Sequence, residues 1–398
     1  MSTARPIIEL LADAPLVDGH NDLLWELRVR HGYRLGEVDL AGGAPDFHTD
    51  LPRLRQGGLG VQFWSLYVPS HWPAAAAVTA TLEQADGLHA LLEAHPDHLA
   101  AARTTDEVTQ VVASGRIASV AAIEGGHSIG CSLGTLRAMY ALGVRAMTLT
   151  HNDNTPWADS ATDHPAHGGL TRFGREVVRE MNRLGMLVDL SHVAATTMHQ
   201  ALDEADAPVI FSHSGARAVC SHPRNVPDDV LRRLPANGGV CMVTFAAGFV
   251  GEEAGRVWQA RGLEHRRRAA SHPDDPAVVE RAMADFDKAH PMPRTTIAQV
   301  ADHVDHIRAV AGIDHLGIGG DFDGVPFLPE GLQDVSGYPA LFEELRRRGY
   351  GDDELHAIAG RNLLRAWRAV EQAASRLRAQ RTPSSARIED LDGTPSPS

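Results

Sequence analysis

The sequence predicts a single (β/α)8 TIM-like barrel of the α/β class, and two observations support this. Eight short, nearly continuous apolar segments occur along the chain, and helix-like segments separate most of them. Such segments are typical of strands buried on both faces, as in a parallel sheet covered by helices, and eight of them suggest a closed barrel. The chain has 398 residues, of which 43% are hydrophobic and 22% charged, so one large core can form.

The elements follow in a regular order. Amphipathic helices are expected at about 76–93, 171–184, 194–204 and 295–311, because apolar residues recur there every 3.6 positions. Segment 246–294 is the least regular and is expected to be an insertion after the seventh strand. Residues 1–380 should form one domain, and residues 381–398, which are rich in Ser, Pro and Thr, a disordered tail. The predicted strands are 16–20, 61–66, 119–124, 146–151, 186–190, 208–213, 239–245 and 316–321.

Charge and cysteine content exclude several classes of partner. The 37 Lys and Arg residues against 51 Asp and Glu residues give a net charge of −14 without a basic run, so neither nucleic acid nor an anionic membrane is an expected partner. The three cysteines, Cys131, Cys220 and Cys241, form no disulfide framework and suggest a reducing compartment. The first residues lack the layout of a signal peptide, and no apolar run approaches the ~18 residues of a membrane span. We therefore expect a cytoplasmic protein.

Ionisable residues gather at the ends of the predicted strands. Barrel enzymes build their active sites at the carboxyl ends of the strands, from several strands at once. One acidic residue or histidine in such a position would mean little, whereas six strands that end this way predict an active site. The residues concerned are His20 and Asp22, Glu124, His151, His192, His213 and Asp321.

The spacing of His20 and Asp22 suggests a metal site. Residues i and i+2 of an extended chain point to the same face, so both side chains can bind one cation. Imidazole and carboxylate without sulfur suit zinc, and also manganese or cobalt. The alternative is an ordinary surface turn at Asp18-Gly19.

Glu124 and two further histidines extend this site. A carboxylate at the end of an apolar strand is costly to bury unpaired, so Glu124 either pairs with an arginine or bridges two cations roughly 3.5–4 Å apart. A lone histidine there is more often a core residue than a ligand. His192 and His213 each follow a serine at the end of adjacent strands, which favours a second metal site.

Longer motifs resemble the membrane (renal) dipeptidase family of binuclear zinc metallopeptidases, which is amidohydrolase-like. They occur in the family's order from residue 17 to about 365, and so cover nearly the whole chain before the tail. The RNVPDD and GGDFDG motifs are the most specific. The motifs are VDGHND at 17–22, LTHN at 149–152, NTPWAD at 154–159, DLSHV at 189–193, FSHS at 211–214, RNVPDD at 224–229 and GGDFDG at 319–324.

The resemblance implies zinc-dependent hydrolysis of dipeptides. It implies two Zn²⁺ per chain with Glu124 bridging, His20 and Asp22 on one ion, and His192 and His213 on the other. A hydroxide between the metals would be the nucleophile, His151 would stabilise charge on the scissile carbonyl oxygen, and Arg224 would hold the substrate's C-terminal carboxylate. Asp321 would move a proton from the water to the leaving amine. It also implies a homodimer, and acceptance of a D-residue at the C-terminal position of the dipeptide.

Departures from the family and rival functions remain. Unlike the mammalian members, this chain is expected to lack a secretion signal, a lipid-anchor tail and paired cysteines, so its physiological substrates are not expected to be those of the mammalian enzymes. A related barrel hydrolase could use the same metals on lactones, β-lactams or phosphoesters. Arg224 distinguishes the dipeptidase from these hydrolases, because this arginine predicts a free carboxylate on the substrate. A non-catalytic metal-binding protein would have lost a ligand or Asp321, and none is missing.

Overall fold

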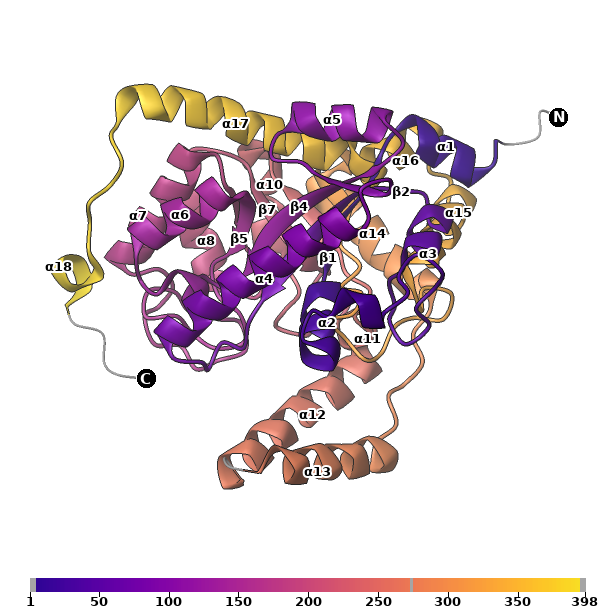
Figure 1. The fold of residues 1–398 in the computed structure, drawn as a ribbon, viewed down its shortest axis with the longest axis horizontal. Helices are drawn as coiled ribbons and strands as arrows, with labels where there is room; N and C mark the ends of the chain where they lie inside the picture. Colours follow the sequence, from indigo (N-terminus) through magenta and orange to yellow (C-terminus); the bar gives the residue numbers. More distant parts are fainter. Residues whose placement is uncertain (1–4, 273–274, 394–398) are drawn as a thin grey trace.

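A computed structural model, which describes residues 5–272 and 275–393, confirms the predicted barrel. All strands are parallel, and their neighbours run β2-β1-β9-β8-β7-β6-β5-β4, with a β2–β4 pairing that closes the ring. Helices surround the strands (Figure 1). The barrel strands are β1 (Leu16–Asn21), β2 (Leu59–Tyr67), β4 (Ile117–Glu124), β5 (Val144–Thr148), β6 (Leu187–Asp189), β7 (Val209–Ser214), β8 (Val240–Val243) and β9 (Leu316–Ile318).

One further strand, β3 (Leu99–Ala101), was not predicted. It pairs with residues 117–119 of β4, whereas β5 pairs with residues 121–123 of the same strand. Three residues are too few for a strand pattern to be visible in the sequence. Strand β3 therefore extends the sheet at the amino-terminal end of β4, away from the mouth.

The four predicted helices are confirmed as α4 (Ala74–Ala94), α7 (Arg172–Leu184), α8 (Ala195–Glu204) and α14 (Ile297–Ala311). Helix α14 begins at a capping box, in which the side chains of Thr296 and Gln299 each accept a backbone N–H of the other residue. The other helices around the barrel are α1 (Ile7–Asp13), α2 (Leu23–His31), α3 (Leu51–Gln56), α5 (Thr105–Ala113), α6 (Leu133–Leu142), α9 (Asp228–Leu231), α10 (Leu234–Asn237), α15 (Tyr338–Arg347), α16 (Asp352–His356) and α17 (Asn362–Gln380).

Segment 246–294 is an insertion after the seventh barrel strand, as predicted, but it is not irregular. It contains α11 (Ala247–Val250), α12 (Glu252–Ser271) and α13 (Pro276–Ala289), and the last two form a helical arm that projects from the barrel (Figure 1). Val279 and Met283 are buried in the arm, and Arg261 donates two hydrogen bonds to Asp287 at 2.8 and 3.1 Å. The sequence did not show the regular structure of this segment because α12 is rich in charged residues, which obscure its apolar face.

Part of the segment predicted to be a disordered tail, residues 381–393, has a defined course in the structure. Residues 381–387 lead from the end of α17 down one side of the molecule to a short helix, α18 (Ile388–Asp392) (Figure 1). Ile388 is buried, and Asp392 accepts the backbone N–H groups of Arg172 and Phe173 at 3.1 and 2.9 Å. A carboxylate there satisfies unpaired N–H groups at the start of α7. Residues 394–398 lie outside the described residues.

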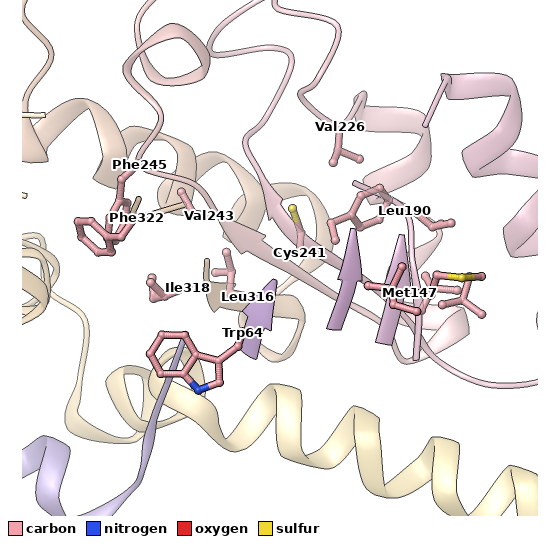
Figure 2. Packing of buried hydrophobic residues seen from close by; sticks show 14 of the residues in the cluster. Trp64, Met147, Leu190, Val226, Cys241, Val243, Phe245, Leu316, Ile318 and Phe322 are labelled. Carbon is pink, nitrogen blue, oxygen red and sulfur yellow. The ribbon is translucent and has the colours of Figure 1, made fainter. Parts of the chain in front are cut away.

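Apolar side chains from different strands and from the surrounding helices pack together in one core. Figure 2 shows Trp64 of β2, Met147 of β5, Cys241 of β8 and Leu316 of β9 among them, and all four are fully buried. All three cysteines of the chain are free, as expected from their number. Because a close-packed interior resists deformation, the strand ends are held in fixed positions.

Candidate active site

The predicted site residues converge at one place. A cavity of about 330 Å³ opens at the carboxyl ends of the barrel strands, within the size range of small-molecule sites. His20 lies beside it, in contact with Asp22 and Glu124. The cavity is lined by seven other residues from the prediction, Asp22, Glu124, His151, His192, His213, Arg224 and Asp321.

Glu124 stands at the centre, and its two oxygens face different histidines. Oε1 lies 3.0 Å from Nε2 of His192, 3.5 Å from Nε2 of His151 and 3.6 Å from Nε2 of His213. Oε2 lies 3.5 Å from Nε2 of His20 and accepts a hydrogen bond from Ser65 at 3.1 Å. In the described part of the chain no arginine lies within salt-bridge distance of this carboxylate, so the ion-pair alternative is wrong. The geometry is that of a carboxylate able to bridge two cations.

His20 and Asp22 form one side of the site. Nε2 of His20 lies 3.1 Å from Oδ2 of Asp22 and 3.9 Å from Oδ1 of Asp321. Asp18 and Gly19 lie within buried strand β1, which excludes the surface-turn alternative. Oδ1 of Asp22 is buried and has no hydrogen-bond partner among the described residues. An unpaired buried carboxylate oxygen beside an imidazole fits a cation.

His192 and His213 form the other side. Their Nε2 atoms lie 3.0 Å apart, so lone pairs on both nitrogens can point to one cation. Burial lowers the pKa of both imidazoles well below the ordinary value, and the neutral form is the one that binds metal. His192 has a φ of +67°, a left-handed conformation that is uncommon outside glycine. Such strain at a site is typical of functional residues.

A hydrogen-bond relay fixes the tautomer of His213. The hydroxyl of Ser212 donates to Oδ2 of Asp189 at 2.6 Å, because an ionised carboxylate only accepts. Its oxygen, 2.8 Å from Nδ1 of His213, must then accept the Nδ1–H. Nε2 of His213 is therefore left without a proton and free to bind a metal. Histidines that bind metals commonly donate their other ring N–H to such a partner.

Sequence reasoning missed two buried carboxylates that position the site. Asp189 accepts four hydrogen bonds, from the N–H groups of Ser191 and Ser212 and the hydroxyls of Thr148 and Ser212. Asp18 accepts the N–H groups of His20 and Gly320 and the hydroxyl of Tyr338, and burial raises its pKa to about 6. Each acid lies two or three positions before a site histidine in its motif. This spacing was the one sign in the sequence that the two acids support the site.

The charges around the cavity favour cations in its centre. Burial by itself lowers the pKa of His20, but Glu124 and Asp22 outweigh it and raise that pKa well above the ordinary value. Burial, with Asp22 and Glu124 nearby, raises the pKa of Asp321 to about 8. Three carboxyl groups thus crowd a small buried volume, an arrangement that bound cations would relieve.

Arg224 adds a positive charge to the cavity wall. It is 2% exposed, and burial lowers its pKa to about 10, so it stays protonated at neutral pH. Its two terminal nitrogens make only long contacts, 3.5 Å to Oγ of Ser214 and 3.4 Å to the carbonyl of His213. Nε has no hydrogen-bond partner among the described residues. A buried guanidinium with so few bonds is suited to an anionic group.

This barrel, with carboxylates and neutral histidines around one cavity at its mouth, defines the class of metal-dependent barrel hydrolases. The family is now clear, because the model of the membrane dipeptidase family, peptidase family M19, matches residues 4–381. The chain belongs to that family.

Relatives by sequence agree. The chain is 42% identical over 370 residues to Dipeptidase 3 of Rattus norvegicus, covering 92% of this chain and 67% of that protein. It is 41% identical over 382 residues to Dipeptidase verJ of Clonostachys rogersoniana, covering 93% of this chain and 88% of that protein. The chain thus spans about two thirds of the rat protein's length.

Solved structures agree as well. Dipeptidase AC, a metallopeptidase of family M19, has a TM-score of 0.74 and 27% identity, with 90% of this chain and 98% of that chain covered. A metallopeptidase from Rhodobacter sphaeroides, solved with a phosphinate mimic of the dipeptide L-Ala-D-Ala, has a TM-score of 0.74 and 26% identity, with 90% and 99% covered. In residues 5–272 and 275–393 no helix combines the length and apolarity of a membrane span. Location in the cytoplasm and a homodimer stay predictions.

Proposed function

We propose that this protein is a zinc-dependent dipeptidase that holds two Zn²⁺ per chain. His20 and Asp22 would hold one ion, His192 and His213 the other, and Glu124 would bridge them. The observation that carries the proposal is the position of the Glu124 carboxylate. Its Oε2 faces His20, and its Oε1 faces His192 and His213. When bound, such ions lower the pKa of a water from 15.7 to roughly 7 and so supply hydroxide as the nucleophile.

The substrate class follows from Arg224. A guanidinium that is buried at the cavity wall and poor in partners suits the C-terminal carboxylate of a substrate. The scissile bond must lie at the metal-binding residues while the C-terminal carboxylate contacts Arg224. Only one residue then separates the scissile bond from the carboxylate, so dipeptides fit and longer peptides do not. The names of the relatives, Dipeptidase 3 and Dipeptidase verJ, support this class. The L-Ala-D-Ala mimic in the Rhodobacter sphaeroides protein supports extending it to L,D-dipeptides.

Two residues would act on the reacting atoms. His151 lines the cavity beside Glu124, and burial lowers its pKa well below the ordinary value, so its neutral imidazole can donate to the oxygen of the attacked carbonyl. Asp321 also lines the cavity, and no hydrogen bond to its carboxylate occurs among the described residues. It is therefore available to take a proton from water and give it to the leaving amine.

A substrate panel tests the proposed function. Zinc-loaded protein is given L,L- and L,D-dipeptides, their C-terminal amides and matching tripeptides, and the release of free amino acid is measured. We expect turnover of free dipeptides and poor turnover of amides and tripeptides, because an amide leaves the Arg224 charge without its partner. Equal turnover of amides and tripeptides would show that Arg224 does not hold the carboxylate. The broader hydrolase class would then be the better description.

A further inference from the structure

A second cavity adjoins the first and has no part in the chemistry proposed above. It measures about 480 Å³ and shares Asn152, Arg224, Phe249 and Trp258 with the first cavity. Its remaining wall comes from segment 153–164, from His222 and Pro223, and from helix α12. The two cavities therefore meet at these four residues, Arg224 among them.

One face of the helical arm forms the outer wall of this cavity. Trp258, Gly262 and Arg266 of α12 line it at intervals of four residues, with Gln259 and Leu263 beside them. Leu263 is 62% exposed, although it is a large apolar residue. A ligand in the cavity would cover it.

An aromatic contact ties the arm to the proposed carboxylate site. The ring of Trp258 meets the ring of Phe249 edge-on, with centroids 5.8 Å apart. The guanidinium of Arg224 lies 5.1 Å from the centre of the same Phe249 ring. The wall of the second cavity is thus continuous with the group that would hold the end of the substrate.

The stereochemistry of a bound dipeptide leads into the second cavity. This inference rests on the proposed function, in which the C-terminal carboxylate lies on Arg224 and the scissile nitrogen lies in the first cavity. Both groups are attached to one Cα, whose two remaining substituents are hydrogen and the side chain. The second cavity adjoins the first at Arg224, Phe249 and Trp258, and so it offers space into which the side chain can extend.

We propose that this second cavity binds the C-terminal side chain of the dipeptide and selects large apolar or aromatic ones. Its apolar lining consists of Ala161, Pro223, Phe249, Trp258 and Leu263. Gly262 leaves room at the centre of the α12 face, because a Cβ built there meets no heavy atom within 4 Å. Burying apolar side chains against this lining stabilises the complex through removal of apolar surface from water.

The polar groups around this cavity fit a neutral side chain. Asp163 already accepts the backbone N–H groups of Asn154 and His164 at 2.9 and 2.7 Å. Asp153 accepts the hydroxyl of Ser70. His222 is neutral at physiological pH, since burial lowers its pKa to about 3. Arg266, at the exposed end of the α12 face, is the one arginine or lysine of the cavity lining besides Arg224. Its positive charge makes an acidic side chain of the substrate the competing possibility.

Substitution of Gly262 tests the proposal without touching the proposed catalytic residues. Gly262→Leu places a side chain in the open cavity, and replacing a helical glycine favours the helix. Ala260→Leu is the matched control, because Ala260 is exposed on the same helix and lines neither cavity. The measured quantity is kcat/KM of the zinc-loaded proteins for Ala-Phe, Ala-Ala and Ala-Asp.

We expect the natural protein to prefer Ala-Phe to Ala-Ala by at least ~10-fold, the usual discrimination of an apolar pocket. Gly262→Leu should lower kcat/KM for Ala-Phe by ~10-fold and leave Ala-Ala nearly unchanged, and Ala260→Leu should change neither. An unchanged ratio of Ala-Phe to Ala-Ala in Gly262→Leu would overturn the subsite alone. A natural preference for Ala-Asp would overturn its apolar selectivity. Failure to cleave any dipeptide would overturn the proposed function and the subsite with it.

Discussion

Asp189→Asn should weaken zinc binding although Asp189 contacts no metal in the proposed arrangement. Oδ1 of Asp189 accepts two backbone N–H groups, of Ser191 and Ser212, at 3.0 and 2.9 Å. Backbone donors cannot reverse, so the oxygen of an asparagine must stay at that position and its NH₂ must replace Oδ2. The NH₂ then faces the hydroxyls of Thr148 and Ser212.

This replacement reverses the relay. Ser212 must accept from the new NH₂ and turn its own hydrogen toward Nδ1 of His213. The proton of His213 moves to Nε2, the nitrogen proposed to bind zinc. Loss of such a supporting partner costs about 10–100-fold in metal affinity, or about 1.4–2.7 kcal/mol.

The assay is competition for zinc with a chromophoric chelator at fixed pH. Thr148→Val is the control, because it removes one donor to Asp189 and leaves the link between Ser212 and His213 intact. We expect Asp189→Asn to lose affinity at one of two sites, and Thr148→Val to lose much less. Wild-type affinity in a folded Asp189→Asn protein would refute the tautomer reasoning.

Three further predictions follow from other contacts. Asp321→Asn should retain its metals and lose at least ~10²-fold in turnover, measured with a free dipeptide, because a positioned proton carrier is removed; near-normal turnover would exclude that role. Arg224→Met should impair hydrolysis of free dipeptides without emptying the metal site, whereas dipeptide amides should be affected little; an equal loss for both would mean that Arg224 acts elsewhere. Asp392→Ala should lower the free energy of unfolding by about 1 kcal/mol, because the N–H groups of Arg172 and Phe173 lose their acceptor; an unchanged denaturation midpoint would show that the Asp392 carboxylate contributes no stability.

The barrel could be predicted from the sequence because buried parallel strands are apolar along their whole length. The candidate site could be predicted for a related reason: a histidine or acid at the end of such a strand contrasts with its neighbours, as Glu124 does after Ile117–Ile123. Elements whose stability comes from tertiary contacts were missed. Helix α18 depends on Ile388 and on the start of α7, and β3 depends on pairing with β4.

The carboxylates that support the site show the same limit. Asp189 and Asp18 lie in the motifs, but their role consists of hydrogen bonds to groups on neighbouring strands, including Ser212 and Gly320. Sequence spacing along one strand does not reveal such partners. The helical arm shows a different limit, because charged residues on α12 obscure the face that lines the second cavity.

Metal content tests the central claim most directly. Protein purified with zinc supplementation and freed of loosely bound ions by gel filtration is measured by elemental analysis, beside Glu124→Ala and His192→Ala. The proposed site predicts close to two equivalents of zinc in the active protein, loss of both in Glu124→Ala, and loss of mainly one in His192→Ala. A reproducible single equivalent in fully active protein, or two retained in Glu124→Ala, would contradict a pair of ions bridged by Glu124.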